Sequence, residues 1–218
     1  MAEKWKVFEP VIDSMLCEGT LREAFLSAAE EDGDVRGMCF TGDTLDALSG
    51  QTLDVSGCRF ERCTFGELDF SRISFVDCIF EKCELSNLRI ASAACQRVQF
   101  HQCRMTGMEL MRGALMSTVF SGCMMDYLSL SECKLDRAEM KECRLRESLW
   151  GDVKLPKARF DACDLSRAQW IRTPLQGVDL STCQIPGWNI SLFDLKGAKV
   201  TAAQVIDLSG LLGVEIIP

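Results

Sequence analysis

The chain has 218 residues with 32 acidic side chains, 24 basic side chains and one histidine, giving a formal net charge of −8. This acidic balance disfavours direct binding to nucleic acid, and no apolar stretch approaches the length that crosses a membrane. The first residues, Met1 to Lys6, lack the apolar core of a secretion signal, so we expect a cytoplasmic protein.

Residues 1–37 show no fixed period and are expected to form an N-terminal helical cap and arm. Thr20 and Glu23 are spaced as a capping box, and Leu21, Phe25 and Ala28 fall on one face of the helix that would follow. We expect this short helix to cover the exposed end of the region that follows it. The remaining arm is a candidate contact for a partner.

From Phe40 to Val200 every fifth residue is large and apolar, with one exception at Gly50. An isolated helix repeats its apolar face every 3.6 residues and a strand every 2, so a period of five fits neither. Fixed-period repetition is typical of a solenoid, whose units bury their inward side chains by stacking. Residues 38–200 are therefore predicted to form one repeating domain.

A second period of twenty residues means that four units make one turn. Thirty-three units between residues 38 and 202 give about eight turns, and strands about 4.8 Å apart give a rod on the order of 40 Å long. Two interior columns follow this period: Phe40, Phe60, Phe80, Phe100, Phe120 and Phe160, and Cys63, Cys83, Cys103, Cys123, Cys143, Cys163 and Cys183.

Individual units match a loose motif of a small residue, a polar residue, Leu or Phe, and two polar residues. Examples are Cys163-Asp164-Leu165-Ser166-Arg167 and Val178-Asp179-Leu180-Ser181-Thr182. About three quarters of the chain resembles the pentapeptide-repeat proteins in this way. The resemblance implies an all-β fold, a right-handed quadrilateral parallel β-helix.

Ten of the thirteen cysteines occupy the inward position two residues before a central residue, and Cys95 is itself central. We predict reduced, packed thiols, because stacked side chains on parallel rungs point the same way and do not reach disulfide geometry. Metal binding is disfavoured, since Cys58 and Cys63 have four intervening residues. His101 is expected to point outward, away from Cys103. We therefore predict no catalytic residue, metal or cofactor, and no small-molecule substrate.

The charges of the rod nearly cancel, because residues 38–202 contain 21 acids and 20 bases. The most acidic side is centred on the column from Leu45 to Ile185, and another side has a basic cluster of Lys134, Arg137, Lys154 and Lys157. The acidic side presents Arg104, Arg144, Arg146 and Arg167 together with the candidate partner-binding acids Asp43, Asp46, Glu67, Glu84, Asp126, Glu147 and Asp164.

One turn near mid-rod is predicted to have an apolar exterior. Met111, Met116, Val119, Met124 and Tyr127 should all face outward within one circuit. Such a belt favours contact with another protein, and methionine suits adaptable contacts.

Residues 201–218 are predicted to form a helix with Thr201 as its N-cap, followed by an apolar tail. An apolar terminus should pack on the last coil or on a second subunit, and the residues expected at such an interface are Val205, Leu208, Leu211, Leu212, Val214, Ile216 and Ile217.

The segment from Asp194 to Ile217 resembles the C-terminal module of the Qnr-type and MfpA-type pentapeptide proteins. The resemblance implies a two-fold dimer whose rod mimics DNA and binds DNA gyrase or topoisomerase IV. The alternative is a generic protein-interaction scaffold that uses the belt or the N-terminal arm. The unbroken phase predicts no inserted loop longer than a turn, unlike some Qnr-type proteins.

Overall fold

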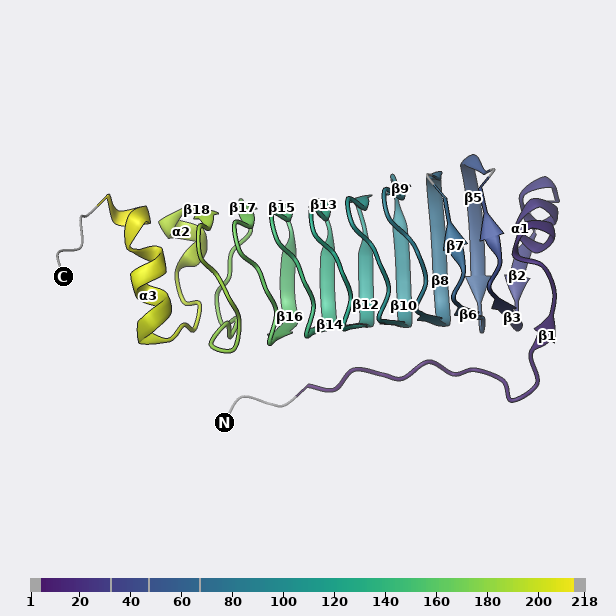
Figure 1. Ribbon diagram of the computed structural model, residues 1–218, viewed down its shortest axis with the longest axis horizontal. Helices are drawn as coiled ribbons and strands as arrows, with labels where there is room; N and C mark the ends of the chain where they lie inside the picture. The colour runs from purple at the N-terminus through teal and green to yellow at the C-terminus, as the bar shows by residue number, and fades with distance from the viewer. Residues whose placement is uncertain (1–4, 32, 47, 67, 214–218) are drawn as a thin grey trace.

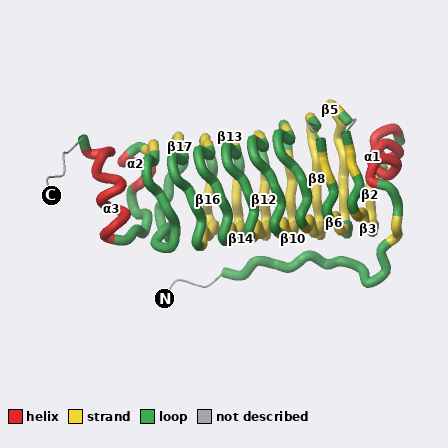
Figure 2. The backbone as a smooth tube through the Cα atoms, viewed as in Figure 1, coloured by secondary structure: helices red, strands yellow, loops and turns green. Residues whose placement is uncertain are grey.

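The computed structural model describes residues 5–31, 33–46, 48–66 and 68–213. Its strands stack side by side into a parallel β-solenoid of about eight turns, with a helix at each end (Figures 1 and 2). The predicted all-β repeating fold is therefore confirmed.

Along most of the rod, strands that are neighbours in the sheet are two places apart in the chain. The helices are α1 (Leu21–Glu30), α2 (Leu192–Leu195) and α3 (Ala202–Leu208), followed by a 3-10 turn, η1 (Ser209–Leu212). The strands are β1 (Cys17–Glu18), β2 (Asp34–Arg36), β3 (Met38–Thr41), β4 (Thr44–Leu45), β5 (Ser49–Ser56), β6 (Arg59–Glu61), β7 (Thr64–Phe65), β8 (Asp69–Glu81), β9 (Arg89–Ile90), β10 (Ala93–His101), β11 (Glu109–Met111), β12 (Ala114–Ser121), β13 (Ser129–Ser131), β14 (Lys134–Lys141), β15 (Leu149–Gly151), β16 (Lys154–Asp161), β17 (Gln169–Ile171) and β18 (Asn189–Ile190).

Most strands pair in parallel with the strand one turn later, and most paired residues are twenty apart. Phe100 of β10, for example, pairs with Phe80 of β8 on one side and with Phe120 of β12 on the other. The side centred on Leu45 is continued by single bridges such as Glu84 to Arg104 and Arg104 to Met124. The twenty-residue period of the sequence is thus the hydrogen-bonding register of the sheet.

The one exception in the apolar column has a local structural cause. Gly50 has φ +70°, in the left-handed region that a side chain disfavours, and the pairing of β5 with β8 shifts register beside it. The ladder also reaches back before residue 38, because Val35 of β2 pairs with Val55 of β5.

Aromatic rings stack along the interior as the sequence predicts. The ring centroids of Phe60 and Phe80 lie 4.4 Å apart, those of Phe80 and Phe100 4.8 Å, and those of Phe100 and Phe120 5.0 Å. In the later coils the stacked rings lie in another column, where Trp150 and Trp170 stack at 4.8 Å, while Phe160 remains in the first column and meets both edge-on. The core is one continuous apolar column along the rod.

Helices cover both ends of the column. Thr20 caps α1 by accepting a hydrogen bond from the Glu23 amide, and the buried Phe25 packs against Phe40, Phe60 and Phe65, which confirms the predicted cover. At the other end Thr201 and Gln204 form a capping box on α3. The Gln204 side-chain amide donates to the backbone oxygens of Leu180 and Cys183, which fixes α3 on the last coils.

Candidate interaction surfaces

The cysteine columns lie inside the solenoid. All thirteen cysteines are free thiols, and eleven of them are buried, as the column positions predict. Most column thiols donate to a backbone carbonyl 23 residues earlier, such as Cys63 to Phe40 at 3.4 Å and Cys123 to Phe100 at 3.4 Å. Burial raises the pKa of Cys95 to about 12, so this thiol stays protonated and unreactive at neutral pH.

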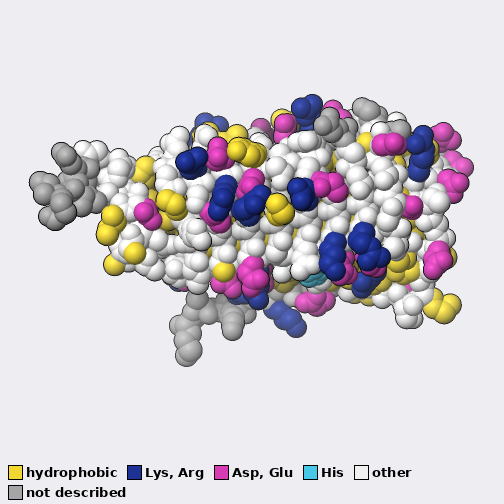
Figure 3. Space-filling model, viewed as in Figure 1, with side chains coloured by type: hydrophobic (Ala, Val, Ile, Leu, Met, Phe, Trp, Pro, Cys, Tyr) yellow, Lys and Arg dark blue, Asp and Glu magenta, His cyan; other side chains and the backbone are white. Residues whose placement is uncertain are grey.

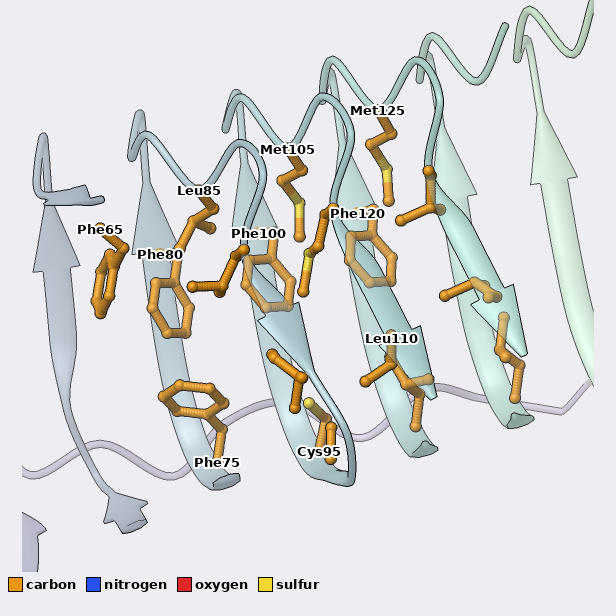
Figure 4. A pocket seen from close by; sticks show the side chains of 18 of the residues that line it. Phe65, Phe75, Phe80, Leu85, Cys95, Phe100, Met105, Leu110, Phe120 and Met125 are labelled. Atoms are coloured by element: carbon orange, nitrogen blue, oxygen red, sulfur yellow. The ribbon is translucent and has the colours of Figure 1, made fainter. Parts of the chain in front are cut away.

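The His, Cys, Asp and Glu side chains of the described ranges were the candidates for a metal site. Within the described ranges no three His, Cys, Asp or Glu side chains are placed to hold a metal ion. His101 is half-buried, and its Nε2 lies 3.0 Å from the side-chain oxygen of Gln99. The cavity drawn in Figure 4 has a volume of about 40 Å³ and is lined by apolar core side chains, among them Phe80, Phe100, Met105 and Met125. Such a lining offers no partner to water or to a polar ligand.

Arginines neutralise the candidate acids of the Leu45 side. The carboxylate of Glu84 lies 3.2 Å from Arg104, that of Glu147 lies 3.7 Å from Arg167, and Asp164 pairs with Arg146. In each pair the partners come from successive coils. The four-sided fold therefore turns the mixed charges of this side into a ladder of ion pairs.

Asp126 differs most from the expected exposed acid. It is buried, lies 2.7 Å from Arg144, and accepts a hydrogen bond from the backbone amide of Arg146. Its carboxylate is thus part of the scaffold rather than a free surface charge. A spacing of eighteen residues between Asp126 and Arg144 was the sequence signal for this pair.

Two further candidate acids hold the N-terminal cap. Asp43 accepts a hydrogen bond from the Leu21 amide at 2.8 Å, at the start of α1, and Asp46 lies 3.1 Å from Arg22 of the same helix. Glu67 lies outside the described residues. On the face shown in Figure 3, basic and acidic side chains are interspersed and do not form a stripe of one sign.

The predicted apolar belt is present only in part. Met111, Met116 and Tyr127 are exposed, whereas Val119 and Met124 are half-buried. Met111 lies in β11 and Met116 in β12, strands that pair with different neighbours and therefore stand on different sides. The exposed side chains therefore do not form one flat patch.

The N-terminal arm lies along the outside of the rod, which the sequence analysis did not predict (Figure 1). The Val11 amide donates to Asp77 at 2.8 Å, and the Gln99 side chain donates to Glu9. Two cations stack on aromatic rings of the arm: Arg137 lies 5.5 Å from the Phe8 centroid and Arg159 lies 4.8 Å from that of Trp5. Trp5 and Phe8 in an otherwise non-periodic segment were the available signal.

The predicted dimerisation residues differ in their exposure. Leu208 is buried and Leu211 is partly buried against this chain's own core, while Val205 is exposed together with its neighbour Ile206. Val214, Ile216, Ile217 and the side chain of Leu212 lie outside the described part of the chain. The helices in the described ranges include none with the length and apolarity to cross a membrane.

The sequence matches the family model described as "Pentapeptide repeat region" over residues 54–117 and 93–170, which together cover more than half of the chain. No sequence among the curated proteins matches it.

Solved structures of other solenoids are similar. A trypsin-treated variant of QnrB1, described as a plasmid-mediated fluoroquinolone resistance protein, aligns with TM-score 0.36 at 18% identity over 84% of this chain and 90% of its own. HetL from the cyanobacterium Nostoc sp. strain PCC 7120, described as involved in heterocyst differentiation regulation, aligns with TM-score 0.28 at 15% identity over 80% of this chain and 92% of its own.

Proposed function

This chain belongs to the pentapeptide-repeat family, and on that premise we propose that it works without catalysis, by presenting its outer surface to another macromolecule. One observation carries the proposal: the fold places eleven of the thirteen thiols and most of the large apolar side chains in the interior. The surface is left with paired charges and a few exposed apolar side chains, which suit binding better than chemistry. Free thiols in such number fit a reducing compartment such as the cytoplasm.

The first partner to test is DNA gyrase or topoisomerase IV. Support comes from the resemblance of Asp194 to Ile217 to the C-terminal module of Qnr-type and MfpA-type proteins. The same end carries exposed apolar side chains at Val205, Ile206 and Phe193, which would suit two-fold pairing with a second copy. A dimer joined there would present two rods pointing away from each other.

Such a complex would not depend on a row of free negative charges. One acid per coil places one charge every ~4.8 Å, whereas duplex DNA has one every ~1.7 Å, and arginines neutralise the acids of the Leu45 side. The enzyme would instead contact a surface of alternating charges, which favours specific pairing over general attraction.

The topoisomerase hypothesis is tested by gyrase supercoiling with and without ciprofloxacin. We expect the purified protein at micromolar concentration either to inhibit supercoiling or to restore it in the presence of the drug. The matched variant is Ile206→Glu, which places a charge on the exposed end without touching the core. It should lower the mass measured by light scattering to that of one chain and weaken the effect on gyrase.

The alternative, a scaffold for an unrelated protein, is favoured by the exposed side chains around mid-rod. If wild-type protein neither protects nor inhibits gyrase and topoisomerase IV, the topoisomerase hypothesis fails while the binding role stands. Met111→Ser with Tyr127→Ser then separates the surfaces, because both side chains are exposed and their loss should weaken binding of a scaffold partner without unfolding the rod.

A further inference from the structure

The N-terminal arm occupies one corner of the solenoid for half its length. The corner column contains Asp77, Arg97, Ser117 and Arg137, each with φ between 52° and 56°. The side chains of Asp77, Arg97 and Arg137 are partly exposed, and Ser117 is buried. The residues Gln99 and Arg159 flank this column on the next side. We call these six residues the corner strip.

The arm fits the strip by length. From Trp5 to Val11 an extended chain spans about 20 Å, and the four rungs from the Asp77 coil to the Arg159 coil span about 19 Å. The contacts follow in order along both partners, Val11 on Asp77, Glu9 on Gln99, Phe8 on Arg137 and Trp5 on Arg159. The strip therefore recognises an extended segment that runs along the rod.

Side chains, more than backbone, hold the arm. Between Trp5 and Ile12 the only backbone hydrogen bond to the rod within the described residues is that of Val11, and no strand is formed there. Val7 is buried, yet Phe8 and Val11 are 56% and 73% exposed. Two hydrogen bonds, two cation–π contacts and the burial of Val7 hold the segment only weakly, so the arm is easily displaced.

The arm leaves part of the strip unsatisfied. The Arg137 guanidinium faces Phe8 and lies 3.5 Å from Asp136, but its Nε is buried and has no hydrogen-bond acceptor. A carboxylate beside the aromatic ring would supply that acceptor. Beyond Trp5 the surface continues into a hollow of about 460 Å³, lined by Arg159, Asp179, Thr182 and Lys199 among others, so a longer segment has room to extend.

We propose that the corner strip is a binding site for an extended peptide segment of a partner protein that carries aromatic and acidic side chains, and that the N-terminal arm is a built-in occupant which this segment displaces. The proposal is independent of which enzyme or scaffold partner the rod serves. Nucleic acid fits the strip less well, because Asp77, Asp136 and Glu139 would repel a continuous row of phosphates. A peptide needs only a single acid at the unpartnered Nε of Arg137, with aromatic side chains on either side of it.

The test uses full-length protein and a fluorescein-labelled peptide with the sequence of residues 5–16 as the probe. Trp5→Ala with Phe8→Ala weakens the chain's own arm and leaves the strip intact. A tethered arm acts at an effective concentration in the millimolar range, so the wild-type strip is largely blocked. We expect the probe to bind this arm variant with a dissociation constant below about 1 mM and the wild type at least tenfold more weakly.

Arg137→Ala with Arg159→Ala, added to the arm variant, should reduce probe binding at least tenfold. The matched control is Arg112→Ala, which removes an exposed arginine from another corner with the same left-handed backbone. It should leave binding unchanged. Thermal melting of each variant confirms that the rod is folded.

Three results would overturn the proposal. They are no binding to the arm variant at 1 mM probe, equal binding to the wild type and the arm variant, or binding that survives loss of both arginines. A labelled DNA duplex serves as a second probe. If weakening the arm increases binding of the duplex and not of the peptide, the strip is a nucleic-acid site and the peptide proposal is wrong.

Discussion

The two halves of the rod fill the same interior in different ways. In the first half five phenylalanines from Phe40 to Phe120 stack in one column, with interplanar angles between 4° and 23°. In the second half Met140 and Phe160 continue that column, and the stacked rings are Trp150 and Trp170 in the column two sides away. The five-residue phase is the same in both.

The difference shows that the five-residue period determines which positions point inward but not which of them has the largest side chain. A ring can move to another column if the neighbouring positions shrink, because the rung needs a filled volume and not a particular residue. The change has a polar consequence. Indole N–H groups enter the core, and they require acceptors that phenylalanine does not.

Those acceptors are supplied unevenly. The Nε1 of Trp150 donates to Ser148 at 2.9 Å, and that of Trp188 donates to the Leu165 carbonyl at 2.8 Å. The Nε1 of Trp170 is buried without a partner. Ala168 stands where Ser148 stands one coil earlier.

The largest effect should come from the phenylalanine column. Phe80→Ala removes a ring stacked on both Phe60 and Phe100, and we expect a loss of about 4 kcal/mol in the free energy of unfolding. Met140→Ala, in the same column of the second half, should cost less, about 3 kcal/mol, because no stacked rings are lost. Urea unfolding followed by circular dichroism measures both. Equal losses would mean that ring stacking adds nothing to the first half.

The next effect concerns the tryptophan half. Ser148→Ala leaves the Trp150 N–H buried without an acceptor, and we expect a loss of about 2 kcal/mol, again from urea unfolding. Ser129→Ala is the control, because this half-buried serine of the preceding coil makes no side-chain hydrogen bond within the described residues, and it should change stability by less than about 0.5 kcal/mol. If both variants lose the same amount, the serine matters only as a small core residue.

Each half also has an arginine that donates two hydrogen bonds to an aspartate on the preceding coil. These are Arg97 on Asp77, at 2.6 and 2.6 Å, and Arg172 on Asp152, at 2.7 and 2.6 Å. The Asp77 side chain is 15% exposed and that of Asp152 is 40% exposed. Asp77→Asn should therefore destabilise more, by about 1 kcal/mol at pH 7, and Asp152→Asn less.

At low pH the wild type and Asp77→Asn should have the same free energy of unfolding. The Arg97 hydrogen bonds lower the pKa of Asp77 below its ordinary value of 3.8. A lowered pKa means that the folded state holds the carboxylate ionised, so the stabilisation is present above pH about 4 and is lost as the pH falls through the lowered pKa. Unfolding of both proteins between pH 2 and 7 checks this. If the two proteins still differ in stability at pH 2, the packing of the side chain and not its charge causes the difference.

The smallest effect should be a gain. Ala168→Ser places a hydroxyl beside the unpartnered Nε1 of Trp170, as Ser148 does for Trp150. The Ser148 hydroxyl donates to the Leu145 carbonyl, and the equivalent carbonyl one coil later, that of Leu165, already accepts from Trp188. The new hydroxyl would have to share this acceptor, so we expect only about 0.5 kcal/mol of added stability. The melting temperature should rise accordingly, and the matched Ala138→Ser, in a buried site without an indole, should lower it. A loss in Ala168→Ser would show that the site has no room for the hydroxyl.

The period made the interior predictable to the residue. Phe25, the phenylalanine and cysteine columns, and the Thr201 cap could all be named because each depends on spacing along the chain. The burial of Asp126 and the hydrogen bond of Asp43 could not be predicted. Both depend on which arginine or backbone amide lies beside the carboxylate in the next coil or in the N-terminal helix. Docking of the arm was also missed, since Trp5 and Phe8 bind residues more than a hundred positions away without any repeat to mark them.

The register of twenty residues makes the outside of the molecule a linear scale. Any two residues twenty apart stand about 4.8 Å apart along one line, and a step of five moves a quarter of the way around. Removing or adding one whole coil would shorten or lengthen the rod by about 4.8 Å, and the remaining columns would stay aligned. A partner that touches two points on this surface therefore measures a distance, and sequence changes in multiples of twenty alter that distance without altering the points themselves.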